Sequence, residues 1–173
     1  NVEDCDIYNN NTYGIEVKLE AYPVIKHCKI NDNKFSGIYL EGPGKSSVEE
    51  CDIFANVYSG LSITGGSNCI VKKCRCYRQI RGGITISEES SPLIEDCDIY
   101  ENSYSGILIN KQSNPSIRRC RIYNGKECGV LFYENASGSL ENSHVYNNAL
   151  SCIEIKEKSS PSIRKCRVYD GKQ

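Results

Sequence analysis

Apolar and polar residues repeat along this chain with a period of 23 residues. The unit reads apolar-x-x-Cys-x-apolar-aromatic-x-Asn, and after a short interval it continues Gly-apolar-x-apolar. The first apolar position of each unit is Val2, Ile25, Val48, Val71, Ile94, Ile117, Leu140 and Ile163. Alternation of β-branched and polar residues over a few positions is typical of a short strand. The pattern therefore predicts at least two short strands in each unit, with corners between them.

A fixed period of this size indicates one small structural unit that is stacked along an axis. We predict an all-β fold, a single-stranded right-handed parallel β-helix (a solenoid) of about 7.5 rungs, with about five inward side chains per rung. Residues 1–173 are expected to form one such domain, with rungs starting near positions 2, 25, 48, 71, 94, 117, 140 and 163. Because the chain begins and ends within a repeat, we expect it to be a piece of a longer array.

A glycine column precedes the second strand: Gly14, Gly37, Gly60, Gly83, Gly106 and Gly129, with Cys152 in its last place. It predicts a corner that needs either a positive φ or a close backbone approach. A leucine-rich repeat is the alternative, because Ile25 to Asn33 fits the opening of its consensus. Two observations oppose it: Gln79, Gly125 and Gly171 replace the asparagine, and Gly-Ile-x-Ile is a strand where that fold needs a helix or an extended convex segment.

Seven of the eleven cysteines follow the same period: Cys5, Cys28, Cys51, Cys74, Cys97, Cys120 and Cys166. Equivalent side chains on stacked strands lie about 4.8 Å apart and point in parallel directions. A disulfide needs Cβ atoms about 3.8 Å apart that face each other. The row therefore predicts buried free thiols and, with them, an intracellular protein of the cytoplasm or nucleus. If any bond forms, Cys128 and Cys152 are the pair expected to make it.

Charged residues around the cysteines alternate in sign from rung to rung, so their period is 46 residues. Glu3, Asp4 and Asp6 surround the first cysteine, and Lys26, His27 and Lys29 surround the second. Stacking places each set against the opposite sign, so we predict ion pairs here rather than a nucleic-acid surface, and the net charge of −1 agrees. The acidic first rung and basic last rung predict head-to-tail self-association through uncapped ends. No apolar run is long enough for a bilayer, and we expect no membrane contact.

The outward positions of the Gly-Ile-x-Ile strand offer no catalytic group. No two neighbouring rungs supply the paired carboxylates that glycoside hydrolysis uses, and Glu16 and Glu41 are offset from each other. His27 and His144 are five rungs apart, roughly 24 Å, so they cannot share a metal or a triad. We therefore predict no catalytic residue, no metal site and no cofactor.

Two surface features remain. Tyr8, Phe54, Tyr77, Tyr100, Tyr123, Tyr146 and Tyr169 form an aromatic column, which predicts stacked rings or, alternatively, a strip that binds sugar or peptide. Tyr39, Leu108, Leu131 and Tyr133 occupy outward positions of the Gly-Ile-x-Ile strand. Exposed apolar residues on adjacent rungs favour a partner contact. These four residues are the predicted binding candidates.

The rung Asn114-Pro-Ser-Ile-Arg-Arg-Cys-Arg-Ile-Tyr-Asn-Gly and the rung that begins Gly138-Ser-Leu-Glu resemble the β-helix repeats of F-box-only ubiquitin-ligase adaptors. Carbohydrate-binding proteins and sugar hydrolases of the pectin-lyase-like fold share this repeat class. The resemblance covers nearly the whole chain and implies a β-helix that recognises substrates in such adaptors. Cysteine stands where those adaptors often have asparagine, and the chain has no F-box or zinc-finger segment.

The first functional hypothesis is a non-catalytic interaction module that holds a protein partner, in the manner of a ubiquitin-ligase adaptor. The alternative is a carbohydrate-binding or polysaccharide-processing β-helix, with carbohydrate as its partner. A purely structural rod is the third hypothesis. Fold alone does not choose among them, because function depends on sites that differ between proteins of one fold.

Overall fold

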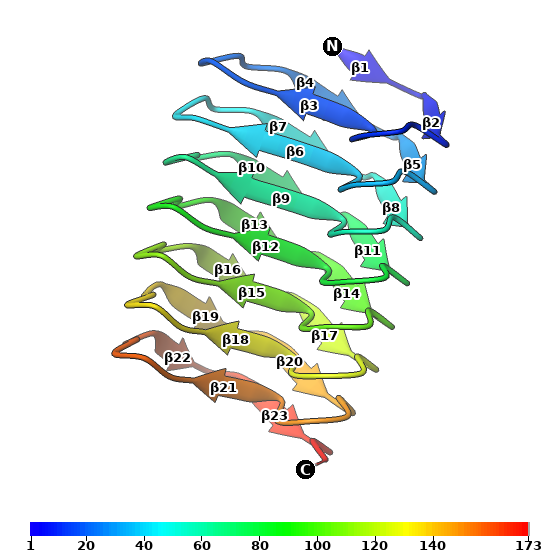
Figure 1. Ribbon diagram of the computed structural model, residues 1–173. Helices are drawn as coiled ribbons and strands as arrows, with labels where there is room; N and C mark the ends of the chain where they lie inside the picture. Colours follow the sequence, from blue (N-terminus) through cyan, green and yellow to red (C-terminus); the bar gives the residue numbers. More distant parts are fainter. Residues whose placement is uncertain (173) are drawn as a thin grey trace.

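The computed structural model describes residues 1–172, which form three parallel sheets that wind around one axis (Figure 1). Sheet A contains β1 (Val2–Glu3), β4 (Val24–Lys26), β7 (Ser47–Glu49), β10 (Ile70–Lys72), β13 (Leu93–Glu95), β16 (Ser116–Arg118), β19 (Ser139–Glu141) and β22 (Ser162–Arg164). Sheet B contains β2 (Asp6–Tyr8), β5 (Lys29–Asn31), β8 (Asp52–Phe54), β11 (Arg75–Tyr77), β14 (Asp98–Tyr100), β17 (Arg121–Tyr123), β20 (His144–Tyr146) and β23 (Arg167–Tyr169). Sheet C contains β3 (Ile15–Val17), β6 (Ile38–Glu41), β9 (Leu61–Thr64), β12 (Ile84–Ile86), β15 (Ile107–Ile109), β18 (Val130–Phe132) and β21 (Ile153–Ile155).

Each rung supplies one strand to every sheet, and each strand pairs with its equivalent 23 residues away. Val71 of β10 pairs with Ile94 of β13, and Ile94 pairs with Ile117 of β16. The parallel β-helix and its 23-residue rung are therefore confirmed. Residues 1–172 contain no helix, so the leucine-rich alternative is wrong, and no segment of them forms a helix that could cross a membrane.

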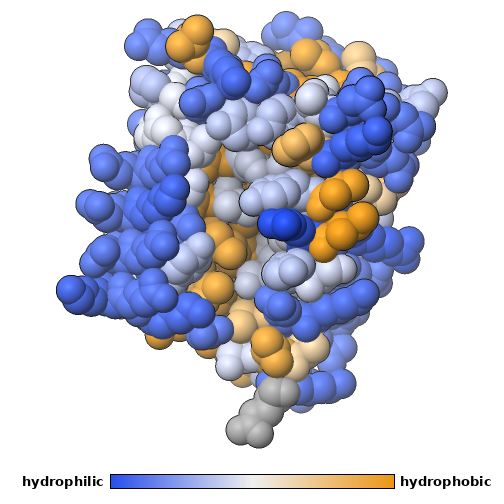
Figure 2. Space-filling model, in the orientation of Figure 1, coloured by the Kyte–Doolittle hydropathy of each residue, from blue (hydrophilic) through white to orange (hydrophobic). Residues whose placement is uncertain are grey.

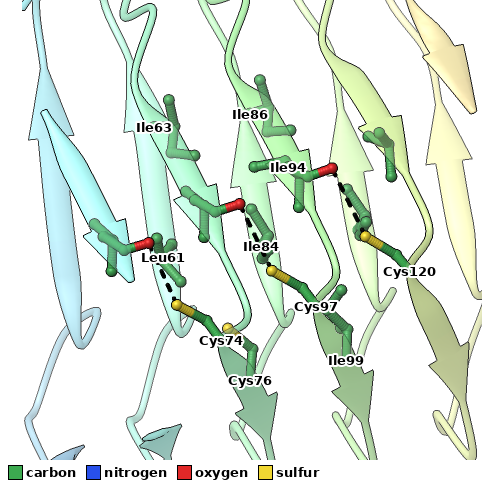
Figure 3. Close-up of a cluster of buried hydrophobic side chains, with 14 of the residues drawn as sticks. Leu61, Ile63, Cys74, Cys76, Ile84, Ile86, Ile94, Cys97, Ile99 and Cys120 are labelled. Atoms are coloured by element: carbon green, nitrogen blue, oxygen red, sulfur yellow. Dashed lines mark hydrogen bonds between the residues drawn. The ribbon is translucent and has the colours of Figure 1, made fainter. Parts of the chain in front are cut away.

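The core lies inside the three sheets and is filled by isoleucine, valine, leucine and cysteine (Figure 3). The ladder cysteines point inward, and Sγ of Cys74 donates a hydrogen bond to the carbonyl oxygen of Val48 at 3.5 Å. Cys97 and Cys120 repeat this contact with Val71 and Ile94, each at 3.7 Å. Each thiol thus links its own rung to the rung before it.

All eleven cysteines are free thiols, including the seven of the row for which the spacing predicted it, although Cys5 and Cys166 at its ends are only half-buried. Cys128 and Cys152 are not joined, and Sγ of Cys128 donates instead to Oε2 of Glu154 at 2.9 Å. Burial, together with the carboxylate of Glu154, raises the pKa of Cys128 to about 12. Burial also raises the pKa of Cys69 to about 12. These thiols stay protonated at neutral pH and are poor nucleophiles.

The glycine column marks a close backbone approach and not a positive φ. A Cβ atom on Gly106 would lie 2.6 Å from Cγ2 of Ile122 and 2.7 Å from the carbonyl oxygen of Gly129 on the next rung. The left-handed conformation occurs instead at the residue before each ladder cysteine, for example Lys73 (φ 51°), Asp96 (φ 55°) and Arg119 (φ 52°). This bend separates the strands of sheets A and B.

The asparagine column does more than mark a turn, because its side chains form a buried ladder inside the solenoid. Nδ2 of Asn33 donates to Oδ1 of Asn56 at 2.9 Å, and Nδ2 of Asn56 donates to Oε1 of Gln79 at 3.2 Å. Gln79 thus continues the ladder in place of an asparagine. The substitution of glutamine for asparagine at this position therefore preserves the hydrogen-bonded ladder.

The alternating charges form ion pairs between rungs, as predicted. Arg121 Nε donates to Asp98 Oδ1 at 2.6 Å, and Arg75 binds Asp52 in the same way. Glu95 is buried among these charged groups, with 5% of its surface exposed. Lys72 from one side and Arg118 and Arg119 from the other enclose its carboxylate.

The predicted aromatic column is stacked from Phe54 to Tyr169 along sheet B. Neighbouring ring centroids lie 4.9–5.1 Å apart, and the interplanar angles are 12° or less. Tyr8 lies outside the stack, contrary to the prediction, because Asn31 stands between Tyr8 and Phe54 in the strand register. The rings stack face to face on one another, which supports a structural role for this column.

Candidate functional site

The outer face of sheet C carries two hollows lined by aromatic and hydroxyl-bearing side chains. A larger hollow of about 640 Å³ lies over the turns that follow the strands, and its lining is Gly65, Gly66, Glu88, Glu89, Lys111, Gln112, Glu134 and Asn135. Figure 2 views this face from the front: hydrophilic side chains project along the left edge, and the surface between them and the opposite corner is hollowed. Strand alternation places Ile84 and Ile86 of β12 inside and Thr85 outside. The corner residues before each strand form one wall, and the residues after each strand form the other.

A hollow of about 380 Å³, here called the polar pocket, lies over the middle rungs of sheet C. Its lining is Tyr58, Ser59, Arg81, Gly82, Thr85, Ser87, Tyr104, Ser105, Leu108, Asn110, Lys111 and Tyr133. Tyrosine rings, hydroxyl groups and two cationic side chains therefore share one surface. Such a mixture of apolar area and a few polar groups is typical of a ligand site.

Arg81 is an exposed cation of the polar pocket. Its guanidinium carbon lies 4.6 Å from the ring centroid of Tyr58, so the two planar groups lie against each other. Among residues 1–172, Arg81 makes no ion pair, whereas Lys111 Nζ is bound to Glu88 Oε1 at 3.0 Å. Arg81 therefore has a full set of donors available for an anionic ligand.

The floor of the polar pocket is a hydrogen-bonded layer. The hydroxyl groups of Ser59 and Thr85 lie 2.8 Å apart, and Nδ2 of Asn110 donates to the Tyr133 hydroxyl at 2.6 Å. Asn110 is 8% exposed, and its Oδ1 has no hydrogen-bond partner within residues 1–172. A buried polar atom without a partner is costly, so the asparagine holds an unused acceptor beside the pocket.

A second hollow of about 300 Å³, here called the aromatic pocket, is lined by Tyr13, Phe35, Ser36, Tyr39, Tyr58 and Ser62. The rings of Tyr13 and Tyr39 are stacked with centroids 4.6 Å apart, and Phe35 is tilted against Tyr13 at 5.6 Å. Burial, with a contribution from nearby Glu41, raises the pKa of both tyrosines, so their hydroxyl groups stay protonated. Tyr58 lines both pockets, so they are neighbours along sheet C and are together called the groove here.

The groove contains three of the four predicted binding residues. Leu108 and Tyr133 line the polar pocket, and Tyr39 lines the aromatic pocket. Leu131 lines neither, although it pairs with Leu108 in the register of β15 and β18. The sequence reasoning missed Phe35, Tyr58, Arg81 and Tyr104. All four stand two residues before the glycine column, and that shared position was the signal that could have found them.

Glu16 and Glu41, which were judged unsuitable as a catalytic pair, both face one cation. Nζ of Lys18 lies 2.7 Å from Glu16 and 3.9 Å from Glu41. A third group was not anticipated: the ligand atoms of Glu3, Asp4 and His27 lie within 4.8 Å of one another. All three are exposed at the bend between sheets A and B, away from the groove, and exposed acidic groups often cluster in this way without a metal.

Comparison with known proteins places this geometry among β-helices. The chain matches the family described as right handed beta helix region over residues 1–90 and 59–173. A search of curated proteins finds no match. Among solved structures, the chain is similar to the A-module of the Azotobacter vinelandii mannuronan C-5 epimerase AlgE4, with a TM-score of 0.90 and 15% identity over 98% of this chain and 53% of that one.

Two further structures have the same fold. The periplasmic alginate epimerase AlgG has a TM-score of 0.83 and 17% identity over 92% of this chain and 43% of that one. Pectate lyase Pel9A has a TM-score of 0.71 and 14% identity over 81% of this chain and 41% of that one. The chain thus spans about half the length of these proteins, and the expected link to F-box adaptors is not shown. The stacked 23-residue rungs and the family match together establish that the chain belongs to the right-handed β-helix region family.

Proposed function

We propose that this chain binds an acidic polysaccharide along the outer face of sheet C. The observation that carries the proposal is Arg81, a cation with no carboxylate partner within residues 1–172, set among tyrosines and hydroxyl groups in the polar pocket. A planar guanidinium matches a carboxylate through two parallel hydrogen bonds. The solved structures most relevant here act on mannuronan, alginate and pectate by their names, and these are polymers of uronic acids.

The remaining groups of the polar pocket suit the uncharged part of such a polymer. Tyr104 and Tyr133 offer apolar ring area against which the carbon–hydrogen face of a sugar can lie. Ser87 and Thr85 offer hydroxyl groups that can donate to and accept from sugar hydroxyl groups. The site therefore combines one charged contact with several neutral ones.

Binding, and not hydrolysis by a pair of carboxyl groups, is the proposed contribution of this segment. The residues that line the polar pocket, all within the described part of the chain, include no aspartate, glutamate or histidine. Hydrolysis of a glycosidic bond in the usual way needs a pair of such carboxyl groups on either side of the scissile bond. The similar solved structures, which are alginate epimerases and a pectate lyase, favour the polysaccharide alternative over the protein-binding module. The protein-binding module and the intracellular location stay predictions.

The test is calorimetric titration of the chain with oligomannuronate and oligogalacturonate, with a neutral cello-oligosaccharide as the comparison ligand. We expect the acidic oligomers to bind, and Arg81→Ala to weaken that binding about tenfold or more, because a charged hydrogen bond is lost. Arg78→Ala is the matched control, since Arg78 is an exposed arginine of the same rung that pairs with Glu101 outside the pocket. Equal binding of the neutral oligomer, or an equal effect of the two substitutions, would contradict the proposal.

A further inference from the structure

The geometry points to a second subsite in the groove: we infer that the aromatic pocket holds a neutral sugar ring of the same polysaccharide whose acidic residue lies against Arg81. This inference rests on the proposed function and names its substrate class more closely. The ligand would be a mixed polymer, in which uncharged or esterified residues accompany free uronates.

The lining of the aromatic pocket is suited to a ring without charge. Tyr13, Phe35, Tyr39 and Tyr58 supply four aromatic side chains and no charged group lines it. Phe35 and Tyr58 are 47% and 41% exposed, so ring area is available to a ligand. At the floor, the hydroxyl groups of Ser36 and Ser62 are hydrogen-bonded to each other at 2.7 Å and are buried, so the pocket presents mainly ring surface to a ligand.

The charges around the aromatic pocket disfavour a free carboxylate there. Glu16 and Glu41 stand beside Tyr13 and Tyr39, and the two carboxylates share the single ammonium group of Lys18. One negative charge therefore remains uncompensated at this end of the groove. Arg81 lies on the other side, where it lines only the polar pocket. A uronate at the aromatic end would meet like charge, whereas a neutral ring would not.

The two pockets are adjacent along the solenoid axis, so one extended ligand can contact both. Tyr58 belongs to both linings, and the column that contains it runs parallel to the solenoid axis through Phe35, Arg81 and Tyr104. A polysaccharide that lies along this axis passes from the aromatic rungs to the cationic rung. Its residue at Arg81 is acidic, and its residue at Phe35 is neutral.

The test compares two octagalacturonates, one as the free acid and one with about half of its carboxyl groups methyl-esterified, by calorimetric titration. The half-esterified octamer is expected to bind about threefold or more tightly, because it can place a free acid at Arg81 and an ester in the aromatic pocket. Phe35→Ala should remove this advantage. Leu150→Ala is the matched control: it occupies the same column on a later rung, is 40% exposed, and lines neither the polar nor the aromatic pocket.

A second variant tests the charge at the aromatic pocket without removing any aromatic ring. Glu41→Gln removes the uncompensated negative charge, leaves Glu16 paired with Lys18 at 2.7 Å, and should strengthen binding of the free acid until the two octamers bind equally. The inference is overturned if the free acid binds as tightly as the half-esterified octamer, or if the advantage survives Phe35→Ala. If neither octamer binds at all, the proposed function itself has failed.

Discussion

At the scale of the residue, the bend between sheets A and B shows what the sequence could not reveal. Lys73, Asp96 and Arg119 adopt positive φ although none is glycine, the usual sign of that conformation. Contacts between rungs hold them: Asp96 N donates to the carbonyl oxygen of Arg118 at 3.2 Å, and Arg119 pairs with Asp96. The outward charges were predictable from their alternation. The bend was not, because its support comes from the neighbouring rung.

Glu95 is the residue whose charge the fold stabilises most visibly. Burial of the side chain raises its pKa, but hydrogen bonds from Arg118, Lys72 and Arg119 outweigh that effect and hold the pKa at about 2. A carboxyl group with a lowered pKa stabilises the fold above its unfolded value, and that stabilisation is lost as the pH falls toward the folded value. The stability difference between wild type and Glu95→Gln should therefore be constant from pH 7 to about 5 and shrink between 4.5 and about 2.

Urea unfolding at a series of pH values measures this difference. Glu89→Gln serves as the control, because Glu89 is exposed and makes no ion pair within residues 1–172. A difference between wild type and Glu95→Gln that did not change with pH would show that the three cations do not act on this carboxylate.

At the scale of the element, the strands followed from the sequence more fully than the groove did. Alternation in Gly-Ile-x-Ile predicted sheet C and its outward residues, and it therefore led to Leu108 and Tyr133. Arg81 and Tyr104 lie in the corner before the strand, where no alternation marks a side chain as inward or outward. Their meeting with Leu108 in one pocket depends on how the corner folds over the sheet. The alternation of apolar and polar residues in a strand does not predict which corner residues contact the outer face of the sheet.

The aromatic stack of sheet B offers a test at this scale. Asn31 interrupts it between Tyr8 and Phe54, so Asn31→Tyr would supply a ring with a partner on each side. Each stacked pair contributes about 0.5–1.5 kcal/mol, and we expect the free energy of unfolding to rise by about 1 kcal/mol. Urea unfolding would measure the gain. Asn31→Leu adds apolar area without a ring, and equal stability of the two variants would argue against stacking.

At the scale of the whole molecule, stability is a sum over contacts between adjacent rungs. Asp98 lies between Arg75 and Arg121 in the register of sheet B, and Arg75 also binds Asp52. The ion pairs join Arg75 to Asp52 and Arg121 to Asp98, and the register places Asp98 beside Arg75 as well, so the charges form a column of alternating sign.

Exchange of one pair should reveal this column. Arg121→Asp is expected to lower the free energy of unfolding by about 1 kcal/mol, because it places two acids together. Adding Asp98→Arg should restore only part of the loss, since the new arginine faces Arg75 on the preceding rung. Urea unfolding at low and high salt would measure both effects, and salt should reduce them. Full recovery in the double variant would mean that the pairs act independently.

The charge alternation also bears on how such a chain can change its length during evolution. Gain or loss of two coils preserves the order of acid and base, whereas gain or loss of one coil sets like charges against each other. Duplication in steps of 46 residues is therefore the tolerated route. The seventh coil is the exception, because Asn142 and His144 stand where acids would be expected. A single coil could be added or lost there at the least electrostatic cost.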